Sequence, residues 1–102
     1  MKKRSRVQLD ALVEQATVDC YNDEEQLTGL YTMIEDNLAC PFTTRILGVD
    51  VTVDSVDLRG NDIVAICSRG GARQVIPILE LPLPSPAPDG TEWVEAYRHW
   101  AV

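Results

Sequence analysis

Residues 19–42 read DCYNDEEQLTGLYTMIEDNLACPF and contain the clearest amphipathic helix pattern of the chain. Asn22 is a typical helix N-cap residue, and Glu25, three residues later, is placed to complete a capping box. Pro41 marks the end of the helix, because the residue before a proline is pushed out of the helical region. The sequence therefore predicts one amphipathic helix between Asn22 and Cys40. Its apolar stripe has helical spacing and consists of Leu27, Leu30, Tyr31, Ile34 and Leu38.

Helical patterns also stand on both sides of this stretch. Residues 7–20 carry apolar side chains at helical spacing and predict a first helix, joined to the next by the short link Tyr21-Asn22. Two helices joined so closely are expected to share one apolar face. Residues 91–101 predict a closing helix, capped by Asp89 or Thr91. The inward face of that helix is expected to carry Trp93, Val94, Tyr97, Trp100 and Ala101.

Between these helices the pattern is that of β-strands. Valines alternate with polar residues from position 49, and the alternation slips at Asp54-Ser55, which indicates a β-bulge. Pro77 predicts that the last strand lies at an edge, and the prolines of residues 81–88 predict a stiff extended connection. The fold class is therefore α+β: an N-terminal helical pair, a small twisted antiparallel sheet or SH3-like partly open barrel, and a short C-terminal helix. Five strand segments are expected, at 42–47, 49–54, 56–58, 63–67 and 74–79.

The charge of the chain narrows the choice of partners. Its 102 residues include 9 basic and 16 acidic side chains, for a net charge of −7. Four basic residues fall within the first six positions, so residues 1–6 are expected to form a flexible basic tail before a single domain at 7–102. Without that tail the net charge is −11, which argues against nucleic acid and favours cations or basic partners.

The chain also lacks the marks of an exported or membrane protein. No apolar segment follows the basic start, and no stretch is long and apolar enough to span a bilayer. The three cysteines, Cys20, Cys40 and Cys67, form no C-x-x-C motif and are expected to be free thiols in a reducing cytoplasm.

The sequence gives little support to catalysis and more to cation binding. His99 is the only histidine, and no serine or cysteine nucleophile can be paired with it, so we expect no enzyme. Carboxylates suit hard divalent cations such as calcium. An EF-hand loop that starts at Asp19 is excluded, because Tyr21, Glu24 and Leu30 would occupy its oxygen-ligand, glycine and bidentate-acid positions. Acids in a first helical turn also have a purely structural role, since they stabilise the helix dipole.

Four segments carry a resemblance to a known family. They are VDCYNDEEQ at 18–26, GLY at 29–31, EDNLACPF at 35–42 and EAYRHW at 95–100. The first three match a pattern of the form V-D-x-Y-x-x-E-E-Q, G-x-Y and E-x-x-L-x-x-P-F, and the last is similar to a closing helix with an acid and aromatic residues. The chain thus resembles the small CcbP-type calcium-binding proteins of bacteria from about residue 14 to residue 101. Asn22 departs from the pattern, since the family often has glycine there.

The resemblance implies a protein that binds Ca²⁺ without an EF-hand. The acids on matching positions are Asp19, Glu24, Glu25, Glu35 and Asp36, and Asp23 joins them as an acid at the helix junction. The predicted metal site therefore consists of Asp19, Asp23, Glu24, Glu25, Glu35 and Asp36. Asp50, Asp54, Asp57 and Asp62 of the β region are secondary candidates, because that part matches by pattern more than by identity.

A second hypothesis belongs to a different class of function. The edge strand with Pro77 and the proline-rich connection suggest a small adaptor that binds an unknown protein partner without any metal. In either case we expect a monomer or a weak homodimer.

Overall fold

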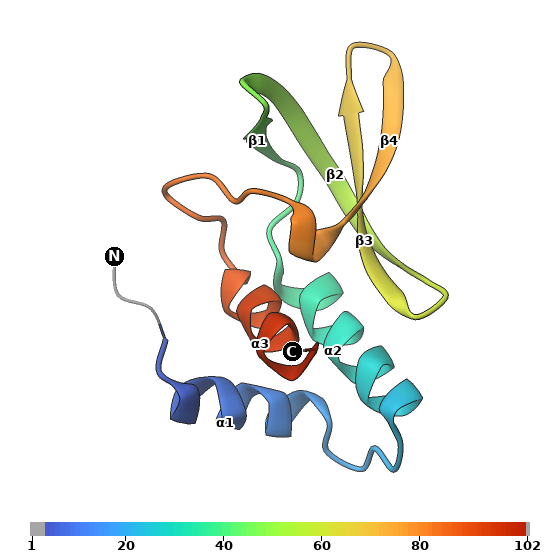
Figure 1. Cartoon of the computed structure of the whole chain (residues 1–102), viewed down its shortest axis with the longest axis vertical. Helices are drawn as coiled ribbons and strands as arrows, with labels where there is room; N and C mark the ends of the chain where they lie inside the picture. Colours follow the sequence, from blue (N-terminus) through green and yellow to red (C-terminus); the bar gives the residue numbers. More distant parts are fainter. Residues whose placement is uncertain (1–3, 102) are drawn as a thin grey trace.

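The computed structural model describes residues 4–101 and confirms an α+β fold (Figure 1). Four strands form one antiparallel sheet in the order β1-β2-β3-β4, so that each strand pairs with the next along the chain. β1 and β4 are the two edges of this open sheet, which does not close into a barrel within the described residues. Three helices gather at one end of the sheet, and the other end extends beyond them. The elements are α1 (Arg6–Ala16), α2 (Asp23–Asn37), β1 (Phe42–Ile46), β2 (Val49–Arg59), β3 (Asp62–Arg69), β4 (Ala72–Pro77), the 3-10 turn η1 (Ile78–Glu80) and α3 (Thr91–Ala101).

The expected count of five strand segments is wrong, because residues 49–59 form one continuous strand. The pairing of β2 with β3 shifts its register between Val53 and Ser55, which confirms the bulge that interrupts the valine alternation. A bulge bends a strand without ending it, so the two predicted segments belong to β2. The last strand, β4, lies at an edge as expected, but it runs over Ala72–Pro77 and not over 74–79, because the chain turns into η1 after Pro77.

The first helix is shorter than predicted and begins earlier. Ser5 forms a complete capping box with Gln8: the Gln8 amide donates to Ser5 Oγ at 3.2 Å and the Ser5 amide donates to Gln8 Oε1 at 2.8 Å. The helix therefore starts at Arg6, inside the segment that was expected to be a tail, while residues 1–3 of that tail lie outside the described residues. It ends at Ala16, and Asp19 has a left-handed backbone with φ of 62°. The junction with α2 is thus residues 17–22, not a two-residue link.

The second helix forms where the sequence predicts it. Asn22 Oδ1 accepts a hydrogen bond from the Glu25 amide at 2.8 Å, which confirms the N-cap. The expected reciprocal bond to the Asn22 amide is not formed, because the Glu25 carboxylate accepts from the Tyr21 amide at 3.4 Å instead. Four of the five stripe residues are buried, and Tyr31 at the margin is half-buried. The buried members are Leu27, Leu30, Ile34 and Leu38.

The core joins the helices to the sheet. Trp93, Val94 and Tyr97 of α3 pack with the α2 stripe and with Ile63 of β3, which confirms the predicted inward face of α3 except at its end. Trp100 is only half-buried against this core, and Ala101 is exposed because α3 runs out past the packed region.

The proline-rich connection after β4 lies on the protein surface and is anchored at its start. Leu81 is buried in a second cluster with residues of β2 and β3. The Thr44 hydroxyl donates to the carbonyl oxygen of Pro82 at 2.5 Å, which ties the connection to β1. Among the helices of residues 4–101, none is both long enough and apolar enough to cross a membrane.

Candidate metal centre

The six predicted ligands divide into two groups at opposite ends of α2. Glu24 and Glu35 are eleven positions apart on a straight helix, which corresponds to about 16 Å along its axis. Calcium–oxygen distances are only about 2.3–2.6 Å, so the oxygens around one ion lie within about 5 Å of each other. One ion therefore cannot contact both groups in this conformation.

The first group borders a pocket between α2 and the β2–β3 turn. Asp23 and Glu24, from the first turn of α2, line this pocket together with Asn61. The cavity measures about 390 Å³, and Leu27 and Trp100 form its apolar wall. Two acidic residues of α2 and one amide-bearing residue of the β2–β3 turn thus border a common space. Their side-chain oxygens are the hard donors that calcium prefers.

The indole of Trp100 is held in place beside this pocket. Its Nε1–H donates to Gln26 Oε1 at 2.9 Å, so a hydrogen bond from α3 to α2 fixes the ring. The aromatic side chain therefore lies next to the two carboxylates without competing for their oxygens.

Two predicted ligands of the first group have different surroundings. Glu25 uses one carboxylate oxygen to accept from the Tyr21 amide, and its own amide donates to Asn22. Asp19 is exposed in the α1–α2 junction. Neither residue lines the pocket of Asp23 and Glu24.

The electrostatics of the α2 N-terminus favour a cation despite the helix dipole. The dipole places roughly half a positive charge at a helix N-terminus, which by itself repels a metal ion. Asp23, Glu24 and Glu25 all lie in the first turn and contribute three negative charges. The negative charge of these three acids is several times larger than the partial positive charge of the dipole, so the net charge at the α2 N-terminus is negative.

The second group, Glu35 and Asp36, lies near the other end of α2. The Tyr31 hydroxyl donates to Glu35 at 2.5 Å. This hydrogen bond, with burial and the charges of Glu35 and Asp57, raises the pKa of Tyr31 to about 12. Asp57 itself accepts from the Leu58 amide at 2.9 Å. Asp36, next to Glu35, is exposed.

Most of the secondary candidates in the sheet already have partners. Asp50 pairs with Arg45 at 3.2 Å, and Asp62 accepts from the Tyr97 hydroxyl at 3.3 Å. Asp57 pairs with Arg59 at 3.0 Å, and this hydrogen bond lowers the pKa of its carboxyl.

Asp54 lies close to two cysteines. Burial raises the pKa of the Cys40 and Cys67 thiols, and the Asp54 charge adds to both shifts. Within residues 4–101 no three His, Cys, Asp or Glu side chains are arranged to hold a metal ion. Any oxygen site must therefore combine the acids with amide, carbonyl or water oxygens.

Asn61 is the pocket residue that sequence reasoning did not select. It stands in the turn Arg59-Gly60-Asn61, which the sequence identifies only as a turn. Its position opposite Asp23 depends on how the β2–β3 hairpin packs against α2, and no local pattern encodes that contact. The signal available in the sequence is only that an amide-bearing residue follows a glycine at a hairpin tip.

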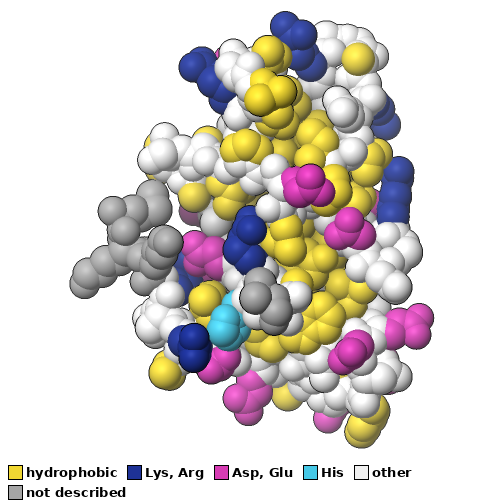
Figure 2. Space-filling view, viewed as in Figure 1, with side chains coloured by type: hydrophobic (Ala, Val, Ile, Leu, Met, Phe, Trp, Pro, Cys, Tyr) yellow, Lys and Arg dark blue, Asp and Glu magenta, His cyan; other side chains and the backbone are white. Residues whose placement is uncertain are grey.

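Acidic side chains dominate the helical end of the molecule. On the face drawn in Figure 2, Asp and Glu are spread mostly over the half that contains the helices, where a few Lys or Arg side chains and the histidine also lie, and further Lys and Arg stand at the far end of the sheet. The fold and this pocket together define an acidic α+β protein with hard oxygen donors at a helix terminus, as in cation-binding proteins.

Comparison with known proteins identifies the family. A family model described as calcium binding, of the CcbP type, matches residues 10–101, and the chain belongs to this family of calcium-binding proteins, which is not an enzyme family. The crystal structure of Anabaena CcbP matches with a TM-score of 0.76, over 98% of this chain and 93% of that chain, at 16% sequence identity. That similarity confirms the fold. No curated protein sequence matches the chain.

Proposed function

We propose that this protein binds Ca²⁺ in the pocket between the first turn of α2 and the β2–β3 turn. The observation that carries the proposal is the common cavity of Asp23, Glu24 and Asn61. The membership of the chain in a calcium-binding family supports the choice of ion.

The donor set is suited to calcium more than to other common divalent cations. Calcium takes about six to eight oxygens in irregular geometry, whereas zinc prefers nitrogen and sulfur ligands and magnesium demands a near-ideal octahedron. Two carboxylates and one amide supply about five oxygens at most, and water completes the shell in an exposed site. Such a partly hydrated site has an affinity on the order of micromolar to millimolar, which suits a sensor or a buffer.

The remaining predicted ligands have supporting roles in this proposal. Glu25 and Asp19 raise the negative potential at the α2 N-terminus without entering the pocket. Glu35 and Asp36 form a separate acidic pair at the other end of the helix. We propose this pair as a second Ca²⁺ site that is weaker than the first, because a Glu35 oxygen already accepts a hydrogen bond from the Tyr31 hydroxyl.

An NMR titration of ¹⁵N-labelled protein tests the proposal. We expect Ca²⁺ to produce saturable shifts in the amides of Asp23, Glu24 and Asn61 and in the indole N–H of Trp100, with much smaller shifts for equal Mg²⁺. The double variant Asp23→Asn/Glu24→Gln removes two charges and is expected to lose these shifts. The matched control Glu35→Gln/Asp36→Asn removes two charges at the other end of α2 and is expected to keep them. No saturable shift at these positions below about 10 mM Ca²⁺ would refute the proposed site.

The adaptor hypothesis keeps one supporting observation. Residues 72–75 of the edge strand β4 are exposed, including the apolar Val75, so strand addition by a partner is sterically open. A pull-down with EGTA or Ca²⁺ separates the hypotheses, since calcium-independent capture that depends on β4 favours the adaptor.

We also propose a cytoplasmic location, because Cys20, Cys40 and Cys67 are free thiols.

A further inference from the structure

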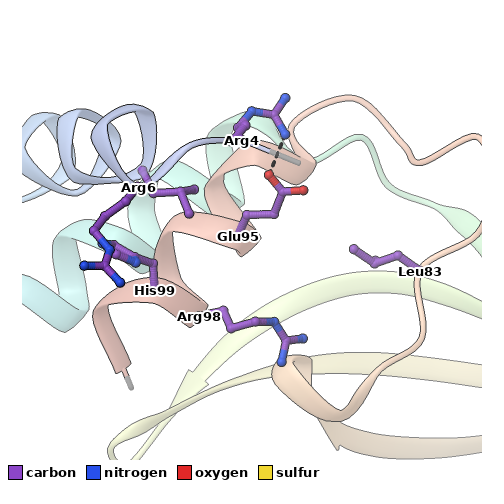
Figure 3. Close-up of a pocket in the computed structure, with 7 residues that line it drawn as sticks. Arg4, Arg6, Leu83, Glu95, Arg98 and His99 are labelled. Carbon is purple, nitrogen blue, oxygen red and sulfur yellow. Dashed lines mark hydrogen bonds and ion pairs between the residues drawn. The ribbon is translucent and has the colours of Figure 1, made fainter. Parts of the chain in front are cut away.

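A second cavity lies on the other side of α3 and has the opposite charge. It is an open hollow of about 720 Å³, bordered by the start of α1, one side of α3 and the connection that follows η1 (Figure 3). This volume is within the range of about 300–1,000 Å³ that is typical of small-molecule sites. Its lining residues are Arg4, Arg6, Leu9, Leu83, Glu95, Arg98 and His99.

The charge of this lining is unusual for the chain. Three of the nine basic residues of a protein with net charge −7 surround one cavity, and Glu95 is the only acid among the lining residues. Arg4 forms an ion pair with Glu95 at 2.5 Å, so that charge is compensated. Arg6 and Arg98 remain, and among residues 4–101 neither forms an ion pair. The lining residues therefore carry a net charge of +2 with His99 neutral, and Asp10, which contacts His99, adds one negative charge beside them.

Several contacts hold the walls of the cavity in place. Arg98 Nη2 donates to the Leu79 carbonyl oxygen at 3.0 Å, which orients the guanidinium and leaves its other N–H groups available. His99 Nε2 contacts Asp10 Oδ1 of α1 at 2.6 Å and links α3 to α1. In Figure 3, Arg98 extends from α3 towards η1, and Leu83 points back into the space between them.

This chemistry selects an anion with an apolar body. Guanidinium groups match phosphate oxygens in a bidentate manner, and a phosphate monoester carries about −1.5 to −2 charges at neutral pH, close to the +2 of the lining. A monocarboxylate neutralises only half of that charge. Leu9 and Leu83 provide an apolar surface for the rest of the ligand. We propose that this cavity binds a small organic phosphate monoester, independently of the calcium pocket.

The proposal is tested by titrating ¹⁵N-labelled protein with phenyl phosphate in the presence of EGTA, so that no calcium bridge forms. We expect saturable shifts in residues 4–9 and 95–99. Inorganic phosphate lacks the apolar body, and benzoate lacks the second negative charge. Both are expected to bind at least about fivefold more weakly than phenyl phosphate. Equal affinity for benzoate would overturn the selection of a phosphate.

Matched variants decide whether the cavity itself is responsible. Arg6→Gln and Arg98→Gln are each expected to weaken phenyl phosphate binding about tenfold. Arg73→Gln, on the exposed edge strand, changes the net charge equally and is expected to leave the affinity within about twofold. Equal losses in all three variants, or no saturable shift of wild-type protein below about 10 mM, would overturn the proposal. Because Arg98 contacts the backbone, unfolding curves of each variant confirm that it is folded before affinities are compared.

Discussion

Gly29 permits the closest approach between α1 and α2, and the variant Gly29→Ala tests this packing. A Cβ built at Gly29 would stand 2.2 Å from the carbonyl oxygen of Ala16 and 3.2 Å from its carbonyl carbon. Carbon and oxygen atoms in contact are separated by more than about 3 Å, so α1 must shift by about 1 Å to admit the methyl group. The obstacle is backbone at the end of a helix, which cannot rotate away as a side chain can.

Two opposing terms determine the size of the effect. Alanine is favoured over glycine in a helix interior by about 1 kcal/mol. Overpacking of a close helix contact costs typically about 1–3 kcal/mol, and a rigid backbone obstacle places this case at the upper end. We therefore expect a net loss of about 2 kcal/mol in the free energy of unfolding. For a domain of this size, that corresponds to a fall in Tm of roughly 8–16 °C.

Urea denaturation followed by circular dichroism measures this loss, with Gly71→Ala as the matched control. A Cβ at Gly71 meets nothing within 4 Å, and this glycine lies outside the left-handed region. The control is expected to be neutral or more stable by up to about 1 kcal/mol, since alanine restricts the unfolded chain. A Gly29→Ala protein as stable as wild type would refute the account of the α1–α2 contact.

Three further variants or titrations probe other parts of the fold. Asn22→Ala removes the cap of α2 and is expected to lower the free energy of unfolding by about 1 kcal/mol in the same urea assay. Ile34→Ala opens a cavity in the fully buried centre of the core and is expected to cost about 2–5 kcal/mol, again measured with urea. NMR titration is expected to show Tyr31 ionising at about pH 12, and Glu35→Ala should move its pKa down towards 10 by removing both the hydrogen-bond acceptor and the carboxylate charge. Because the raised pKa favours the protonated phenol in the folded protein, this contribution to stability is intact below pH 10 and is lost as the pH rises through 12.

Elements in which apolar residues recur at regular spacing were predictable from the sequence. The stripe of α2 and the aromatic face of α3 recur at helical spacing, and the slip in the valine alternation correctly located the bulge of β2. The α1–α2 junction was not predictable in the same way. Apolar residues continue at helical spacing to Cys20, but the helix ends at Ala16, where its carbonyl packs against Gly29. That tertiary contact takes precedence over the local periodicity.

In the calcium pocket and in the basic cavity, the sequence shows some of the lining residues, but only the folded protein shows which residues lie together. The acids of the first turn of α2 were visible as a charged cluster, and a family resemblance pointed to calcium. Their partner Asn61 comes from a hairpin turn nearly forty positions later, and only the packed fold brings it to the same pocket. Likewise, Arg4 and Arg6 read as part of a basic tail in the sequence. Ser5 caps α1 between them, and in the folded protein both arginines line the cavity beside α3.

Isothermal titration calorimetry with Ca²⁺ measures binding at the pocket of Asp23, Glu24 and Asn61. The account predicts saturable binding to the wild-type protein and an affinity at least about tenfold lower for Asp23→Asn/Glu24→Gln. Asn61→Ala, which removes an uncharged donor, is expected to weaken binding without any change in net charge, whereas Glu35→Gln/Asp36→Asn leaves the main binding event within about twofold. Loss of binding in Glu35→Gln/Asp36→Asn, with full affinity retained in Asp23→Asn/Glu24→Gln, would contradict the account and move the calcium site to the other end of α2.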